Sequence, residues 1–172
     1  MNLKSKIREI PDWPEKGVNF KDITPLLQDK EAFKFVIDKM CEPFIENKPD
    51  IIVGIDARGF ILSAAMAYKL NTGLAIIRKK GKLPHKTISA DYTLEYATNT
   101  IEMHEDAIQK GQKVLLVDDV LATGGTMEAT AQMVEKLGGQ ILGIAFLIEL
   151  DFLKGKEKLK NYKVESLIHY ES

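Results

Sequence analysis

Two adjacent acids followed by a run of small residues form the stretch of this sequence with the clearest chemical meaning. Asp118 and Asp119 follow the apolar run 114–117, and the small residues that come next are Ala122, Thr123, Gly124, Gly125 and Thr126. Paired glycines let backbone N–H groups approach a ligand, and a helix that starts there adds the positive end of its dipole, so the loop suits a phosphate group. Two carboxylates beside a phosphate need hydrogen-bond donors or a cation, which a ribose diol or a magnesium ion supplies.

The same stretch has a plainer interpretation, in which one acid caps a helix and the glycines only turn the chain. A strand, an acid pair, a small-residue loop and hydroxyl groups in one place favour the ligand site over that alternative. The stretch is not a P-loop, because the glycine spacing and the lysine of that motif are both missing.

The apolar pattern around this stretch predicts alternating strands and helices. Short runs rich in Ile, Val and Leu are typical of buried parallel strands, and they occur at 51–55, 74–77, 114–117, 141–147 and 164–168. Helical spacing of apolar residues predicts helices at 60–70, at 127–137, and at 33–45 with Asp29 as N-cap and Pro43 near the end. We therefore expect an α/β fold, with a central, mostly parallel sheet flanked by helices, in a single domain over residues 1–172.

A long excursion, residues 79–104, lacks any sustained helical stripe. Tyr92 and Tyr96 belong to an alternating apolar and polar pattern that resumes after residues 97–99, which predicts a β-hairpin with its turn at those three residues. A period of two places Glu95 on the face opposite the tyrosines. Connections of this length inside a compact domain are usually functional.

The composition narrows the class of partner. The 172 residues carry a formal net charge of -1, so no general basic field draws the chain to nucleic acid. Cys41 is the only cysteine and there are three histidines, a set that allows no internal disulfide and predicts no structural zinc site. The start of the chain is charged, and no apolar run approaches the length that spans a bilayer. We expect a small-molecule partner, no nucleic acid, no membrane and a cytoplasmic location.

The segment 117–126 resembles the phosphoribosyl pyrophosphate motif of the type I phosphoribosyltransferases. Membership of that family implies a parallel sheet flanked by helices, with a smaller hood. It also implies that residues 122–126 hold the 5′-phosphate of the substrate. Asp118 and Asp119 would bind the ribose hydroxyls, directly or through water and metal.

Further stretches are similar to the adenine branch of that family, at 14–27, 54–60, 78–84, 92–96 and 149–159. The resemblance implies transfer of a phosphoribosyl group to adenine, which gives AMP and diphosphate, by a homodimer with a hood over about residues 1–30 and a mobile hairpin lid over about 79–104. Phe20 would stack on the purine while backbone groups of Asn19 and Lys21 read its edge, although core packing alone could also explain an aromatic residue there. Glu95 would help to manage the purine proton.

The departing diphosphate needs cations where its charge develops. The basic residues that the resemblance and their positions offer for it are Arg58, Arg78, Lys79 and Lys82. The implied cofactor is Mg²⁺, bound chiefly through substrate oxygens and water, with Asp118 or Asp119 able to reach it through water.

Three positions depart from the usual pattern of the adenine branch. Lys21 stands where arginine is frequent, Asn19 replaces a common apolar residue, and Ala97 occupies a place often held by glycine. Three other functions stay open: transfer to another purine or to a pyrimidine, a sensor of phosphoribosyl pyrophosphate that acts on nucleic acid, and a nucleotide-binding module without transferase activity. The sensor lacks a visible nucleic-acid-binding element, and the binding module lacks a GxGxxG motif.

Overall fold

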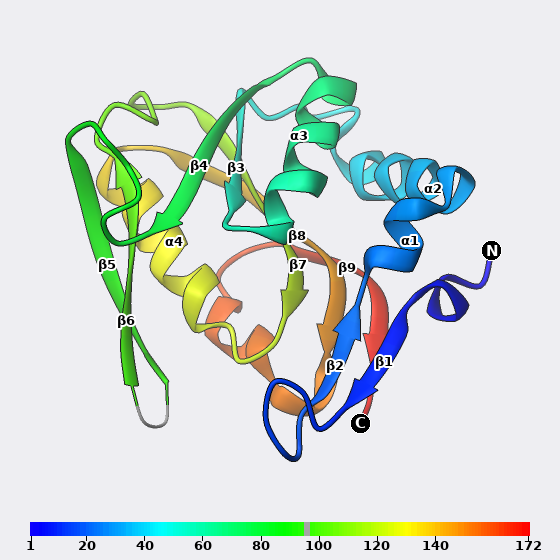
Figure 1. Ribbon diagram of the computed structural model, residues 1–172. Coiled ribbons are helices and arrows are strands. Elements are labelled where there is room, and N and C mark those ends of the chain that lie inside the picture. The colour runs from blue at the N-terminus through cyan, green and yellow to red at the C-terminus, as the bar shows by residue number, and fades with distance from the viewer. Residues whose placement is uncertain (95–96) are drawn as a thin grey trace. The chain divides into compact units, whose positions relative to one another are not determined.

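The computed structural model describes residues 1–94 and 97–172. The chain forms two compact units, Met1–Lys39 and Met40–Ser172, whose α-helices and strands are labelled in Figure 1. Within the described residues, every helix is too short or too polar to cross a bilayer.

The N-terminal unit contains a small antiparallel sheet and short helices. Its elements are η1 (Leu3–Lys6), β1 (Arg8–Pro11), β2 (Asn19–Asp22), α1 (Thr24–Gln28) and most of α2 (Lys30–Cys41). The two strands pair with Ile10 opposite Phe20. Strands of only four residues carry too little alternation to be predicted, and the sequence pattern indicated neither of them.

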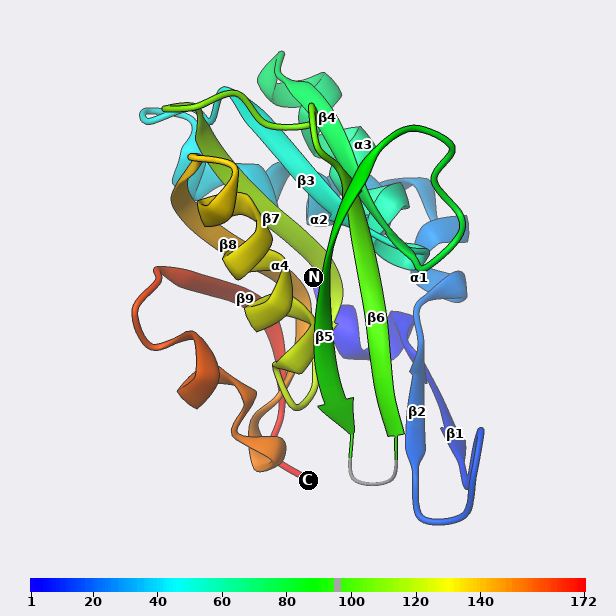
Figure 2. The ribbon, with the colours of Figure 1, turned by 90° about the vertical axis from the view of Figure 1, so that its left-hand side faces the viewer.

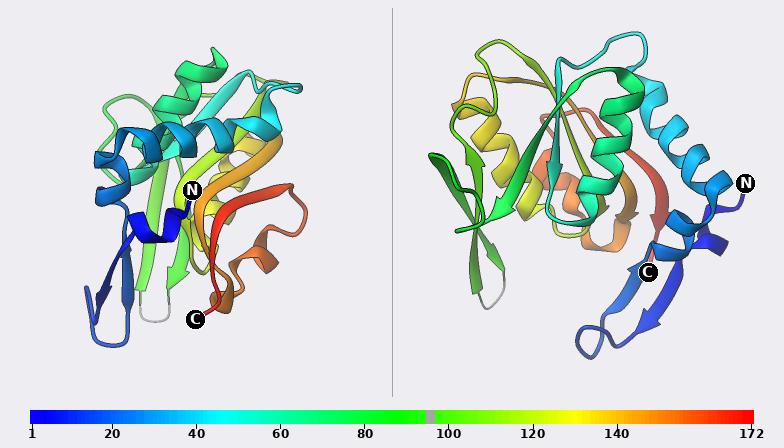
Figure 3. Two further views of the ribbon diagram at one scale, coloured as in Figure 1. Left: turned by 90° about the vertical axis from the view of Figure 1, so that its right-hand side faces the viewer. Right: turned by 45° about the horizontal axis from the view of Figure 1, so that its top comes forward.

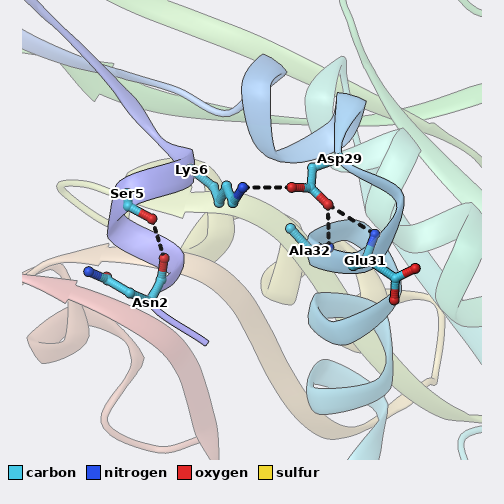
Figure 4. A network of polar contacts seen from close by, with 6 residues as sticks. All are labelled: Asn2, Ser5, Lys6, Asp29, Glu31 and Ala32. Carbon is cyan, nitrogen blue, oxygen red and sulfur yellow. Dashed lines mark hydrogen bonds and ion pairs between the residues drawn. The ribbon is translucent and has the colours of Figure 1, made fainter.

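Asp29 caps helix α2 as the sequence predicts. Its Oδ1 accepts hydrogen bonds from the backbone N–H groups of Glu31 at 3.0 Å and Ala32 at 3.1 Å (Figure 4). Its Oδ2 lies 2.7 Å from the Lys6 ammonium, which ties η1 to the start of α2. The Lys6 hydrogen bond, followed by the Ala32 N–H, lowers the pKa of Asp29. Pro43 follows the end of α2 and lies in the short helix η2 (Glu42–Phe44).

The larger unit is built on a seven-stranded sheet in the order β5-β6-β4-β3-β7-β8-β9. The strands are β3 (Ile51–Ile55), β4 (Gly73–Lys79), β5 (Thr87–Leu94), β6 (Ala97–His104), β7 (Lys113–Leu121), β8 (Gln140–Leu150) and β9 (Val164–Tyr170). Strands β4, β3, β7, β8 and β9 are parallel, while β5 and β6 form an antiparallel hairpin at one edge. The expected central, mostly parallel sheet is confirmed.

The helices of this unit cover both faces of the sheet. Helix α3 (Arg58–Leu70) connects β3 to β4, and α4 (Gly125–Lys136) connects β7 to β8. The two connections run outward in opposite directions along the sheet, and right-handed crossovers then place the helices on opposite faces, as Figures 2 and 3 show. The 3-10 helices η3 (Asp151–Leu153) and η4 (Gly155–Leu159) link β8 to β9. Met127 and Val134 of α4 pack into the core with Phe146 of β8.

Most predicted elements differ from the observed ones by a few residues at their ends, and three of these differences concern the acid pair, the start of α4 and the hairpin. Strand β7 continues to Leu121, so the acid pair lies inside the strand instead of after it, because Val120 and Leu121 continue the pairing with β8. Helix α4 begins at Gly125, two residues earlier than predicted. Leu94 pairs with Ala97, so residues 97–99 belong to β6 and the predicted turn position was wrong. Glu95 lies outside the described residues.

Candidate active site

The C-terminal ends of three neighbouring parallel strands meet at one edge of the sheet. Gly54 of β3 lies between Ile76 of β4 and Val117 of β7 in the pairing register. Arg58 begins α3 shortly after β3, and Arg78 lies one residue before the end of β4. The acid pair lies near the end of β7. Open α/β sheets bind ligands outside the carboxyl ends of their strands, so this edge is the candidate site.

The loop after β7 turns directly into helix α4. Gly124 has a φ of 88°, a left-handed conformation that glycine adopts without the steric penalty of a side chain. A small hollow opens over this turn, lined by residues 121–127 together with Asp118, Val120 and Phe146. The first N–H groups of a helix lack intrahelical partners, so this hollow offers an anion backbone donors and the positive end of the α4 dipole.

A second backbone segment, at the start of η4, packs directly against this loop. A methyl group at Gly155, the first residue of η4, would lie 2.3 Å from the carbonyl oxygen of Ala122. A methyl group at Gly124 would lie 2.6 Å from the carbonyl oxygen of Gly155. The two backbones therefore touch with no room for a side chain. Gly155 falls in the stretch 149–159 that carries the family resemblance, but the sequence alone gave it no role.

The two acids differ in their surroundings. Asp119 is buried, with 7% of its side chain exposed, and its Oδ2 lies 2.7 Å from Nε of Arg58. Asp118 accepts a hydrogen bond at Oδ1 from the backbone N–H of Asp119, at 2.8 Å. Burial raises the pKa of Asp118 well above its ordinary value, the Asp119 carboxylate raises it further, and Arg58 opposes both. A methyl group at Gly59 would lie 2.7 Å from Asp118 Oδ1, so only glycine lets α3 begin this close to the acids.

The other basic residues lie at and beyond the end of β4. Arg78 donates from Nε to Asp56 Oδ2 at 3.3 Å, and the Asp56–Ala57 peptide bond is cis. Lys79 and Lys82 are exposed and belong to one turn, closed by a hydrogen bond from the Lys82 N–H to the Lys79 carbonyl at 3.2 Å. Both arginines are thus oriented by acids, whereas the lysines extend into solvent.

Glu102 of β6 anchors the turn that carries these lysines. Its carboxylate accepts hydrogen bonds from the Gly81 N–H at 2.6 Å and from the Thr87 hydroxyl at 2.8 Å. The Gly81 bond, followed by that from Thr87, lowers the pKa of Glu102. The sequence pattern did not indicate this role, which depends on the pairing of β6 with β4 that places Glu102 opposite Arg78.

Strand β5 borders the phosphate loop from the other side. A methyl group at Gly125 would lie 3.7 Å from the Tyr92 side chain and 4.0 Å from the Lys158 ammonium. A second hollow lies here, lined by Asp91, Tyr92, Thr93, Gly125, Glu128, Ala129, Gln132 and Lys158. Lys158 is a further cation near the start of α4 that no sequence pattern indicated.

The residues expected to bind a base all lie on β2 in the N-terminal unit. The Lys21 side chain is buried, and its ammonium lies 3.0 Å from Glu9 Oε2. Asn19 donates to the same oxygen at 2.5 Å. The Phe20 side chain points to the opposite face of β2 from those of Asn19 and Lys21. Its ring meets that of Trp13 edge to face, with ring centroids 4.6 Å apart. Hydrogen bonds from Lys21 and then Asn19 lower the pKa of Glu9.

Comparison with known proteins gives one consistent result. The family model described as "Phosphoribosyl transferase domain" matches residues 26–170. The chain is 58% identical to an adenine phosphoribosyltransferase of Acetivibrio thermocellus, over 99% of this chain and 100% of the relative. It is 56% identical to an adenine phosphoribosyltransferase of Thermotoga maritima, over 99% of this chain and 98% of the relative.

Solved structures agree with the sequences. The adenine phosphoribosyltransferase of Thermoanaerobacter pseudethanolicus superposes with a TM-score of 0.95 at 49% identity, over 98% of each chain. That of Saccharomyces cerevisiae, solved in complex with adenine and an imino-altritol bisphosphate, superposes with a TM-score of 0.90 at 38% identity, over 96% of each chain.

Proposed function

Because this chain belongs to the adenine phosphoribosyltransferase family, we propose that it transfers the 5-phosphoribosyl group of phosphoribosyl pyrophosphate to adenine, giving AMP and diphosphate. One observation carries the proposal. The hollow over the turn at Gly124 also includes Asp118, and Asp119 next to it contacts Arg58, so all these groups lie at one edge of the sheet. A phosphate loop, a diol-binding acid pair and cations in one place suit a phosphoribosyl donor.

The phosphate loop holds the 5′-phosphate in this proposal. The backbone N–H groups of residues 122–126 donate to its oxygens, and the α4 dipole favours its charge. The hydroxyl groups of Thr123 and Thr126 add donors of the same kind. Gly155 fixes the position of the loop, because its backbone packs directly against Ala122 and Gly124.

Asp118 and Asp119 bind the ribose hydroxyl groups. A carboxylate accepts hydrogen bonds from a vicinal diol, which supplies the donors that two adjacent acids need. Binding of the ribose is coupled to binding of the diphosphate in this proposal, since Arg58 already contacts Asp119. The Asp118 carboxylate, for which burial disfavours the ionised form, is stabilised by any donor that the sugar brings.

Four cations receive the diphosphate as it leaves C1′. Arg58 and Arg78 are oriented by Asp119 and by Asp56, so their donors are arranged before the substrate arrives. Lys79 and Lys82 complete the set from the turn that Glu102 anchors. Diphosphate departs with the electron pair of the C1′–O bond while a ring nitrogen of adenine bonds to C1′ and loses its proton.

Base recognition is assigned to β2. Phe20 stacks on the purine, and backbone groups of Asn19 and Lys21 read its edge, so an amino group can be told from an oxo group. The Lys21 side chain faces Glu9, which supports a role for its backbone only. Residues 1–30 form a hood for the base in this proposal, and residues 79–104 form a lid that brings Glu95 to the purine proton.

The acid pair also fits the Mg²⁺ that the family implies. Carboxylate oxygens are hard ligands of the kind that Mg²⁺ accepts, and it commonly keeps several waters and substrate oxygens besides them. When bound, the ion neutralises part of the diphosphate charge and orients it. Asp118 or Asp119 would hold it through water.

A homodimer and a cytoplasmic location complete the proposal. Ile61 and Tyr68 lie seven residues apart on one side of α3, with exposures of 43% and 91%, which supports burial of this apolar strip against a second copy. A phosphorylated substrate with several charges does not cross a bilayer unaided, so the enzyme is expected where that substrate is made.

The test is diphosphate release by the purified protein with Mg²⁺ and phosphoribosyl pyrophosphate, in the presence of adenine, guanine, hypoxanthine, xanthine or orotate in turn. Release with adenine alone supports the proposal. Release with a different base keeps the phosphate site and contradicts the assignment of β2. No release with any base, together with tight binding of phosphoribosyl pyrophosphate, favours a sensor.

A further inference from the structure

Three potential metal ligands converge at the C-terminal ends of β8 and β9. Glu149 and His169 are direct partners in the parallel pairing of these strands, so their side chains leave the same face of the sheet. Asp151 begins the 3-10 helix η3 that follows β8. The three side chains each bring one ligand atom, and these atoms all lie within 4.8 Å of one another.

Glu149 has a buried carboxylate oxygen that lacks a hydrogen-bond donor among the residues that the structure describes. Only 8% of its side chain is exposed, and its Oε2 accepts no hydrogen bond from any residue within the described ranges. Two nitrogen atoms, Nζ of Lys156 and Nδ1 of His169, each lie 3.9 Å from that oxygen, which is beyond hydrogen-bond distance. A buried carboxylate oxygen without a donor is costly.

We propose that Glu149, Asp151 and His169 bind a divalent metal of the zinc class. The ligand atoms are Oε2 of Glu149, Oδ1 of Asp151 and Nδ1 of His169. Bonds of about 2.0–2.2 Å to one ion place its ligand atoms roughly 3–3.5 Å apart. Nδ1 of His169 lies 2.9 Å from the Asp151 oxygen and 3.9 Å from the Glu149 oxygen, so small side-chain rotations complete the site.

The donor set selects the metal. An imidazole nitrogen with two carboxylate oxygens suits Zn²⁺ and related transition metals, whereas Mg²⁺ takes oxygen ligands almost exclusively. Three protein ligands leave a fourth tetrahedral position for water. The site shares no residue with the Mg²⁺ expected with the substrate, which Asp118 or Asp119 would hold through water. Because all three zinc ligands come from the protein, the zinc site fills without phosphoribosyl pyrophosphate.

The alternative is a simple ion pair between His169 and Asp151. In that arrangement Glu149 relies on the distant Lys156 ammonium, and the cluster has no specific affinity for metal. The two accounts make opposite predictions for Lys156, because a cation next to a metal site competes electrostatically with the ion. If Glu149, Asp151 and His169 bind a metal, Lys156→Met should tighten that binding.

Strand pairing connects the proposed metal site to the phosphate loop. Glu149 pairs with His169 on one side and with Leu121, the last residue of β7, on the other. A bound metal would join β8, η3 and β9 at this edge. It would raise the melting temperature, because a ligand that binds only the folded state stabilises it.

The experiment measures Zn²⁺ alone, by equilibrium dialysis against the purified enzyme without substrates. The wild type should bind one Zn²⁺ per chain, excess Mg²⁺ should not displace it, and His169→Gln should weaken binding by at least about tenfold. His85→Gln is the matched control, because His85 lies 3.8 Å from the exposed acid Asp106 and belongs to no group of three close ligand atoms among the described residues. Its zinc affinity should equal that of the wild type.

Two results would overturn the proposal. One is absence of a stoichiometric zinc in the wild type, and the other is equal zinc affinity in the wild type and His169→Gln. If His169→Gln does not fold, the surface variant Lys156→Met decides, since unchanged zinc affinity there contradicts the proposed site. A zinc-dependent rise in melting temperature that disappears in His169→Gln would support it.

Discussion

Nε of Arg58 and Oδ2 of Asp119 lie 2.7 Å apart, although the two residues come from different elements and are assigned to different ends of the substrate. Arg58 begins α3 and is the candidate for diphosphate, while Asp119 lies in β7 and is the candidate for ribose. Without substrate, each holds the other in place. The pair thus preorganises both halves of the donor site and links them energetically.

Replacing Arg58 with Gln tests this link. We expect kcat/KM for phosphoribosyl pyrophosphate to fall by about 10²–10³, while KM for adenine changes little. The free energy of unfolding should fall by about 1 kcal/mol, because the Arg58 side chain is 40% exposed and the interaction is partly screened. Steady-state kinetics and urea unfolding measure the two effects. Arg8→Gln, which removes a surface ion pair with Asp22, is the control and should leave catalysis unchanged.

Asp118 predicts a specific dependence of stability on pH. Its folded-state pKa is raised above the ordinary 3.8, mainly by burial, so it stabilises the fold below that value and loses this contribution as pH rises through the folded pKa. Asp118→Asn should therefore match the wild type near pH 3 and exceed its melting temperature by roughly 2–4 °C at pH 7. Thermal unfolding across this pH range measures the difference. A constant difference at every pH would contradict the assignment.

The fold was largely predictable from the sequence, while the contacts within the site were not. Short apolar runs predicted β3 with its observed bounds and β9 with its observed start, because buried parallel strands need continuous apolar residues. The end of β7 was missed because acids at 118 and 119 interrupt that run, although pairing with β8 continues past them. The roles of Gly155 and Glu102 depend on contacts between distant segments, which no local pattern encodes.

Gly155→Ala tests whether the phosphate loop depends on backbone packing. The new methyl group would meet the Ala122 carbonyl at 2.3 Å, so the loop must shift. A displacement on the order of 1 Å costs about a hundredfold in kcat/KM for phosphoribosyl pyrophosphate. Gly73→Ala is the matched control, since its methyl group meets only Ile51 at an ordinary 3.6 Å. Equal kinetics for the two variants would rule out the supporting role of Gly155.

Phe20→Ala tests the base assignment. Loss of stacking on a base is worth about 1–3 kcal/mol, so KM for adenine should rise by about 5- to 150-fold while KM for phosphoribosyl pyrophosphate stays close to the wild-type value. Trp13→Phe, which keeps an aromatic ring next to Phe20, should change KM for adenine much less. Unchanged KM for adenine in Phe20→Ala would assign the residue to packing alone.

Glu95→Gln tests the proposed handling of the purine proton. A group that takes part in proton transfer typically contributes about 10²–10⁴ to the rate, so single-turnover AMP formation should slow by at least that lower figure. Glu105→Gln, at the exposed end of the same hairpin, serves as the comparison and should react at the wild-type rate. Wild-type turnover by Glu95→Gln would remove this residue from the chemistry.

AMP formation from labelled adenine and phosphoribosyl pyrophosphate, compared between the wild type and an Asp118→Asn, Asp119→Asn double variant, tests the central claim most directly. We predict one AMP and one diphosphate for each adenine consumed by the wild type. The double variant should give almost no product while circular dichroism shows that it keeps its fold. Wild-type rates in the double variant, or diphosphate release without AMP in the wild type, would contradict adenine transfer at this site.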